Sequence, residues 1–121
     1  MNKCKIVLAE DNSTLSLLLK FRLEREGHEL LMAKDGKMAI ELIENHSPDL
    51  ILTDIMMPFI SGLEVISHVR NKLETQVPII VFSSAGQEEM VLKAFSLGAN
   101  DFMGKPFSPN ELVIRVNRLL A

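Results

Sequence analysis

Polar side chains that could do chemistry together stand where apolar runs of the sequence end. The run Leu50-Ile51-Leu52 leads through Thr53 into a lone carboxylate, Asp54, and apolar residues follow it directly. Two other apolar runs end in Glu10-Asp11 and in Ser83-Ser84, and the last short run of the sequence leads to Lys105. If these runs are parallel strands of one sheet, their carboxyl ends meet at one edge, where ligands bind in such folds. The polar groups could then converge in one cleft.

The three carboxylates of such a cleft would need a compensating cation. Like charges a few ångströms apart repel and raise each other's pKa, so Glu10, Asp11 and Asp54 would not all stay ionised unaided. Mg²⁺ prefers oxygen ligands and is typically held by one or two carboxylates plus a phosphoryl oxygen. Asp11 and Asp54 suit the direct ligands. Lys105 and the Ser83 hydroxyl add donors that suit a phosphoryl group, so the residues indicate phosphate chemistry.

Asp54 is the candidate for the reacting acid. A carboxylate can act as a nucleophile and form an aspartyl phosphate. Asp54 alone follows a central strand, whereas Glu10 and Asp11 are adjacent and should point to different sides of the chain. Taken singly, each residue has a simpler structural role, such as helix capping for Glu10-Asp11 or a turn position for Asp54. Their placement at matching strand ends favours a common site.

Short apolar runs alternate with stretches of helical period, which predicts five βα units and a doubly wound parallel sheet. Runs without apolar and polar alternation indicate strands buried on both faces. The predicted strands span residues 5–9, 28–34, 49–53, 78–82 and 99–103. The predicted helices span residues 12–27, 35 to about 46, 63–72, 86–98 and 108–121.

Caps and apolar faces define these helices. Asn12 or Ser13 and Asp35 are the expected N-caps, Gly27 and Gly98 the stops, and a proline lies in the first turn of the last helix. The expected buried faces of the first four helices are Leu15, Leu18, Leu19 and Leu23; Ala39, Leu42 and Ile43; Val65, Ile66 and Val69; and Val91, Ala94 and Phe95.

Composition limits the class of protein. The chain has 121 residues, 47% of them hydrophobic, which suits one domain over residues 1–121 with its own core. A formal charge of −3 argues against direct nucleic-acid binding, which relies on Lys and Arg. No apolar stretch is long enough to cross a bilayer or to form a signal peptide, and Cys4 stands alone, so we expect a cytoplasmic protein without a membrane partner. His28, His46 and His68 fall at no metal-ligand spacing and are expected at the surface or its boundary.

These motifs, in this order, carry a resemblance that spans nearly the whole chain. They are Glu10-Asp11, Asp54 followed by Ile-Met-Met-Pro, Gly62, Ser83, Gly98-Ala99, Phe102 and Lys105-Pro106-Phe107. The sequence resembles the receiver domains of response regulators in two-component, or phosphorelay, signalling. The resemblance implies a flavodoxin-like α/β/α fold with a five-stranded parallel sheet in the order 2-1-3-4-5 and five helices.

The resemblance also implies roles for the site residues. Asp54 would accept a phosphoryl group from a phosphohistidine on a sensor histidine kinase or a histidine phosphotransfer protein. Mg²⁺, or Mn²⁺ in its place, would be bound by Asp11, Asp54 and the Met56 backbone carbonyl, with Glu10 acting through water. Lys105 would pair with the phosphoryl oxygens, and the Lys105-Pro106 bond would be cis. Ser83 would hydrogen-bond a phosphoryl oxygen, and Phe102 would turn inward as the switch aromatic.

The output surface in such domains is the fourth helix, fifth strand and fifth helix, with Lys93, Phe102, Asn110, Arg115 and Arg118 among the expected exposed residues. A downstream protein, a fused output domain or a phosphorylation-dependent homodimer would use this surface. The chain would either act alone through protein contacts or form part of a longer regulator.

Departures from the family pattern are few. Ser84 stands where a smaller residue is usual, and Ser61 where an Asp is frequent. Met56 and Ala85, at two variable positions near the phosphoryl group, have no polar side chain to orient an attacking water, which predicts slow self-dephosphorylation. Met56 could equally be core filler, or with its neighbours form an apolar lid.

Three other functions fit parts of the pattern. A pseudo-receiver would signal without phosphorylation, but usually lacks the acceptor, an acid or the lysine. A haloacid-dehalogenase-type phosphatase also forms an aspartyl phosphate, but needs a second Asp where this chain has Met56. A flavin carrier would favour aromatic stacking, yet the chain has no Trp or Tyr and its first loop is acidic.

Overall fold

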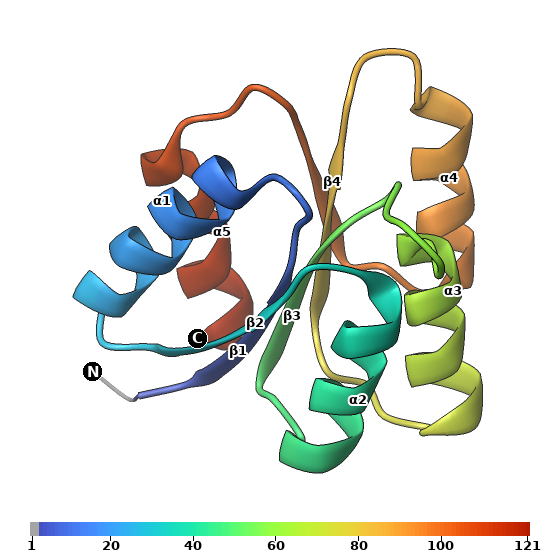
Figure 1. The fold of residues 1–121 in the computed structure, drawn as a ribbon, viewed down its shortest axis with the longest axis horizontal. Helices are drawn as coiled ribbons and strands as arrows, with labels where there is room; N and C mark the ends of the chain where they lie inside the picture. Colours follow the sequence, from blue (N-terminus) through green and yellow to red (C-terminus); the bar gives the residue numbers. More distant parts are fainter. Residues whose placement is uncertain (1–2) are drawn as a thin grey trace.

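A central parallel sheet with helices on both faces makes up the computed structural model, which describes residues 3–121 (Figure 1). The strand order is β2-β1-β3-β4-β5, and every neighbouring pair is parallel. This confirms the predicted flavodoxin-like α/β fold. The strands are β1 (Lys5–Ala9), β2 (Glu29–Ala33), β3 (Leu50–Asp54), β4 (Ile79–Ser83) and β5 (Asp101–Gly104).

The helices begin where the sequence places capping side chains. Asn12 accepts a hydrogen bond from the Leu15 N–H at 3.0 Å, and Asp35 accepts one from the Met38 N–H at 2.8 Å. Ser61 forms a capping box with Glu64, so the serine at this departure from the family pattern has a structural role. The helices are α1 (Ser13–Arg25), α2 (Gly36–His46), α3 (Gly62–Ser67), α4 (Glu88–Leu97) and α5 (Pro109–Leu120), and α3 continues into a π-helical segment, η1 (His68–Lys72).

The sheet separates two apolar cores. One face of the sheet packs against α2, α3 and α4, and the opposite face packs against α1 and α5 (Figure 1). Successive residues of a strand contribute to opposite cores: Ile51 lies in the first, Leu50 and Leu52 in the second, and all three are fully buried. Each such side chain stabilises the fold by roughly 1.5–3 kcal/mol. A strand that is buried on both faces is held rigidly by its packing. A side chain at the end of such a strand therefore has a well-defined position.

Strand ends are shifted by one residue from the prediction at two important places. Asp54 is the last residue of β3, paired with Phe82, and Ser83 is the last residue of β4. The backbone of Asp54 is further fixed by Gly62: a Cβ built there would lie 2.1 Å from the Asp54 carbonyl oxygen, so only glycine fits. The backbone of Asp54 is therefore fixed by strand pairing in the sheet and does not belong to a loop.

Four predictions about individual positions were wrong. Leu18 is 50% exposed, because the inward face of α1 is formed by Ser16, Leu19 and Leu23. Phe95 is 40% exposed, because its ring packs edge-on against Phe102. His28 is buried, at 7% exposure, directly before β2. Ile55 lies in the core, so the stretch after Asp54 does not form an apolar lid as a unit. The π-helical turn of η1 was also not predicted.

None of the helices within residues 3–121 has the length and apolar composition needed to cross a membrane.

Candidate functional site

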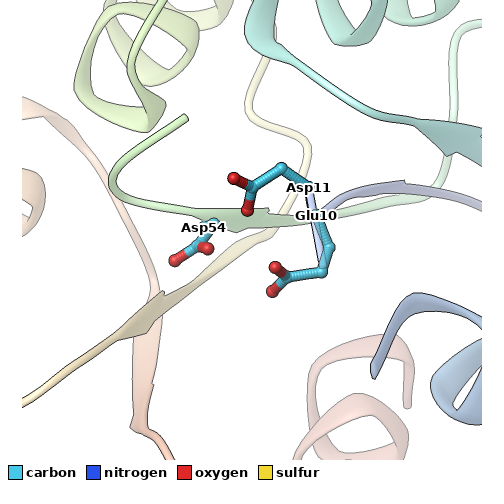
Figure 2. Close-up of side chains that lie close together, drawn as sticks. All are labelled: Glu10, Asp11 and Asp54. Atoms are coloured by element: carbon cyan, nitrogen blue, oxygen red, sulfur yellow. The ribbon is translucent and has the colours of Figure 1, made fainter. Parts of the chain in front are cut away.

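Strand register brings the predicted acids together. Ala9 is paired with Thr53 across β1 and β3, so the residues that follow, Glu10 and Asp54, lie side by side at the carboxyl edge of the sheet. Glu10, Asp11 and Asp54 each place a carboxylate oxygen within 4.8 Å of the others (Figure 2). Figure 2 shows that the neighbours Glu10 and Asp11 leave the chain in different directions, yet their carboxylates lie on the same side as Asp54.

The three carboxylates differ in burial. Glu10 is 2% exposed and Asp54 6% exposed, whereas Asp11 is open to solvent. The Asn12 N–H donates to Glu10 Oε2 at 3.0 Å, so the start of α1 holds this side chain in place. The site is therefore an acidic pocket in which Glu10 and Asp54 are buried and Asp11 is exposed.

Lys105 reaches into the pocket from the loop after β5. Its ammonium Nζ lies 2.8 Å from Glu10 Oε1 and 2.9 Å from Asp54 Oδ2. Its backbone N–H donates to the Ser83 carbonyl at 2.7 Å, which ties the lysine to the end of β4. The Lys105-Pro106 peptide bond is cis, as predicted. One ammonium faces three carboxylates, which leaves the pocket short of positive charge.

Glu10 and Lys105 shift each other's pKa. Desolvation by burial raises the pKa of Glu10, and the charge of Asp54 adds to this, while the hydrogen bonds from Lys105 and Asn12 act in the opposite direction. Burial alone would lower the pKa of Lys105, but its contacts with Glu10 and Asp54 outweigh this and raise it. The net result is a raised pKa for both Glu10 and Lys105, so the ammonium form of Lys105 is favoured and ionised Glu10 is disfavoured by its burial.

The pocket suits a hard divalent cation. All three side chains offer carboxylate oxygens, the ligand type that Mg²⁺ prefers, and no nitrogen or sulfur ligand takes part. Within residues 3–121, the carbonyl oxygen of Met56 accepts no hydrogen bond, which leaves its lone pairs available. The Met56 side chain is 49% exposed, so it is not core filler.

Ser83 and Phe102 border a second hollow beside the pocket. Ser83 is buried at the end of β4, and its hydroxyl makes no hydrogen bond within residues 3–121. Phe102, on β5, is 40% exposed. Between them lies a cavity of about 480 Å³ whose lining includes Val91, Phe95 and Lys105. The cavity gives both side chains room to move.

Lys105 and Arg115 make contacts that were not predicted from the sequence. The sequence indicated Lys105 as a phosphoryl ligand but not as the partner of Glu10, and residue types 95 positions apart give no such signal. On the expected output surface, Lys93, Asn110 and Arg118 are exposed. Arg115 is half-buried instead and pairs with Asp101 at 2.8 Å and Glu111 at 3.3 Å.

Comparison with known proteins identifies the family. The family described as response regulator receiver domain matches residues 6–117. The chain belongs to this family. Receiver domains are phosphoacceptor signalling modules of two-component response regulators rather than conventional enzymes, and an acidic cluster such as Glu10, Asp11 and Asp54 is typical of their metal site. The family assignment argues against the phosphatase and the flavin carrier.

Individual relatives agree with the assignment. The chain is 38% identical over 120 residues to the alkaline phosphatase synthesis transcriptional regulatory protein PhoP of Bacillus subtilis. That match covers 99% of this receiver chain but 49% of the relative, so the chain spans about half the length of the curated relative it matches.

Solved structures of receivers are close to this fold. The receiver domain of a Francisella response regulator superposes with a TM-score of 0.88 at 32% identity, over 98% of this chain and 97% of that one. For a putative response regulator from Chloroflexus aurantiacus the TM-score is 0.91 at 31% identity, over 98% of both chains.

The raised pKa of Glu10 gives a testable dependence of stability on pH. The folded state holds this proton more tightly than the unfolded chain, so stability is lost as the pH rises from the unfolded pKa through the folded pKa. Glu10→Gln keeps an oxygen acceptor for Lys105 but removes the buried charge. With divalent ions chelated, we expect this variant to be more stable than the wild type at pH 7 by about 0.5–2 kcal/mol.

Urea unfolding between pH 4 and pH 8 measures this difference, which should shrink as the pH falls. Glu41→Gln, on the exposed face of α2, is the matched control and should change little. A Glu10→Gln variant that is less stable at pH 7, or a difference that does not vary with pH, would contradict the assigned charge balance.

Proposed function

We propose that Asp54 is the phosphoryl acceptor of this receiver domain and that a divalent cation is required for the transfer. The observation that carries the proposal is the position of the Asp54 carboxylate. It ends the central strand, lies 2.9 Å from the Lys105 ammonium and shares a 4.8 Å cluster with Glu10 and Asp11.

The donor is a phosphohistidine on a sensor histidine kinase or a histidine phosphotransfer protein. A carboxylate oxygen of Asp54 attacks the phosphorus, the P–N bond breaks, and the imidazole leaves with the bonding electron pair and is reprotonated. The Lys105 ammonium is a point charge with three donors, suited to bind an oxygen of the incoming phosphoryl group. The same ammonium lies 2.9 Å from Asp54 Oδ2 and offsets the negative charge of the attacking carboxylate.

The metal would be Mg²⁺, or Mn²⁺ in its place. Asp11, Asp54 and the Met56 carbonyl are the proposed direct ligands, and Glu10 acts through a bound water because Lys105 already occupies its Oε1. When bound, the cation supplies charge that offsets the repulsion between the carboxylates and the phosphoryl oxygens.

Ser83 and Phe102 are the proposed switch. The unpartnered Ser83 hydroxyl donates to a phosphoryl oxygen on Asp54, and the Phe102 ring moves toward the cavity beside Ser83. These movements alter the surface made by α4, β5 and α5, where Leu92 is 70% exposed. A downstream protein, a fused output domain or a second copy of the chain in a phosphorylation-dependent homodimer reads that surface.

We further propose that residues 1–121 form one receiver domain of a cytoplasmic response regulator. The matched family region, residues 6–117, supports this because it covers nearly all of these residues. The domain itself makes no direct nucleic-acid contact, which its formal charge of −3 supports.

Intact mass spectrometry tests the acceptor directly. Incubation with acetyl phosphate or phosphoramidate and Mg²⁺ should add one phosphoryl group. Asp54→Asn and chelation of the metal should each abolish the gain, because the nucleophile or the charge compensation is lost. Asp49→Asn, at an exposed position in the loop before β3, is the matched control and should be phosphorylated normally. A gain of mass in Asp54→Asn equal to that of the wild type would refute the assignment.

Met56 offers a second prediction, on the lifetime of the phosphorylated state. Its half-exposed thioether cannot orient a water for attack on phosphorus, so self-dephosphorylation should be slow. Met56→Asn supplies an amide for that water and should speed the decay about five- to tenfold, the worth of one hydrogen bond in the transition state. Decay is followed by mass after the donor is removed. Met56→Leu should match the wild type, and faster decay in the wild type than in Met56→Asn would exclude this role.

A further inference from the structure

The loop between β4 and α4 is closed by the side chain of Gln87. Gln87 occupies the N-cap position of α4, yet its side chain makes no capping bond to that helix. Its Oε1 accepts a hydrogen bond from the Ser84 N–H at 2.6 Å, and its own N–H donates to the Ser84 carbonyl at 3.3 Å. An N-cap side chain usually satisfies amides in the first turn of its helix. Here it holds the loop instead.

This closure acts next to Ser83. The Ser83 carbonyl accepts the Lys105 N–H at 2.7 Å, and the residue that follows, Ser84, is held by Gln87. Ser83 is therefore restrained on both sides while its hydroxyl has no partner within residues 3–121. The Ser83 hydroxyl is therefore available to donate to a phosphoryl group on Asp54. For Ser83 to move toward Asp54, the hydrogen bond between Gln87 and Ser84 must break.

The other end of α4 is fixed more firmly. Arg70 of η1 donates from Nε and Nη2 to the Gly98 carbonyl, at 3.1 and 2.9 Å, and from Nη2 to Asn100 Oδ1 at 3.0 Å. Its Nη1 also donates to the Thr75 carbonyl at 2.8 Å. Three of these hydrogen bonds hold Gly98 and Asn100, just after the C-terminal end of α4, to η1, against one side-chain bond in the loop before its N-terminal end. Movement of α4 is thus easiest at Gln87.

We propose that Gln87 is a positioning residue that latches the β4–α4 loop and keeps Ser83 away from Asp54 until phosphorylation. The inference rests on the proposed function, since Ser83 must bind the phosphoryl group on Asp54. The loop has two states: one in which Gln87 holds the Ser84 N–H, and one in which the latch is open and the Ser83 hydroxyl donates to the phosphoryl group. Only the second state makes all the contacts to the phosphoryl group. The apparent affinity of the domain for a phosphoryl mimic is therefore its affinity in the open state multiplied by the fraction of molecules in that state.

Gln87→Met tests the latch. Methionine is uncharged and similar in length to glutamine, but its sulfur is only a weak hydrogen-bond acceptor for the Ser84 N–H. Beryllium fluoride, a tetrahedral mimic of the phosphoryl group, measures the affinity at fixed Mg²⁺ by calorimetry. We expect Gln87→Met to bind it about three- to tenfold more tightly, the worth of one hydrogen bond, and to be phosphorylated faster by acetyl phosphate to a similar extent. Amide exchange at Ser84 should also be faster in the unligated variant. Gln76→Met, the same change at an exposed position before β4, should match the wild type.

The outcomes separate the two proposals. If the wild type gains a phosphoryl group but Gln87→Met binds beryllium fluoride no more tightly, the latch is wrong and the proposed function stands. Weaker binding by Gln87→Met would also overturn the latch, because Gln87 would then assist the bound state. If neither protein takes a phosphoryl group or its mimic at Asp54, the proposed function fails and the latch with it.

Discussion

The contact between the Lys105 ammonium and the two buried carboxylates is the interaction on which the site depends. Glu10 and Asp54 are 2% and 6% exposed, and burial of a carboxylate costs free energy unless a cation or hydrogen-bond donor lies beside it. The Lys105 ammonium lies within 2.9 Å of both, and its positive charge offsets part of the cost of burying them. One ammonium does not balance three acids, and the remaining negative charge suits the pocket to the divalent cation that we propose.

The fold supplies the rigidity that this arrangement needs. Residues of β3 and β4 are buried on both faces, so the ends of these strands cannot move far from one another. Asp54 lies within the ladder itself, and Gly62 brings the start of α3 against its carbonyl. By contrast, residues 84–86 after Ser83 are exposed, and the loop is held by one backbone and one side-chain hydrogen bond between Ser84 and Gln87. Asp54 is therefore held firmly, and the segment that leads into α4 is the part of the site that we propose to move.

Much of this arrangement could be predicted from sequence, and the exceptions have physical causes. Strand positions followed from uninterrupted apolar runs, and the caps Asn12 and Asp35 followed from their position before helical periodicity. Leu18 and Phe95 were placed inside because period alone does not say how wide the buried face of a helix is. The burial of His28, the π-helical turn of η1 and the pairing of Glu10 with Lys105 depend on tertiary contacts, which residue spacing does not record.

The most direct test of the charge balance is where a divalent cation binds. Mn²⁺ titrated into the isotopically labelled protein broadens the NMR signals of nearby amides. The proposed ligand set predicts that broadening at low Mn²⁺ concentration centres on Asp11, Asp54 and Met56, and that Asp54→Asn strongly reduces it. Broadening that centres instead on other exposed acids, such as Glu88 and Glu89 in the first turn of α4, or that is unchanged in Asp54→Asn, would contradict the account.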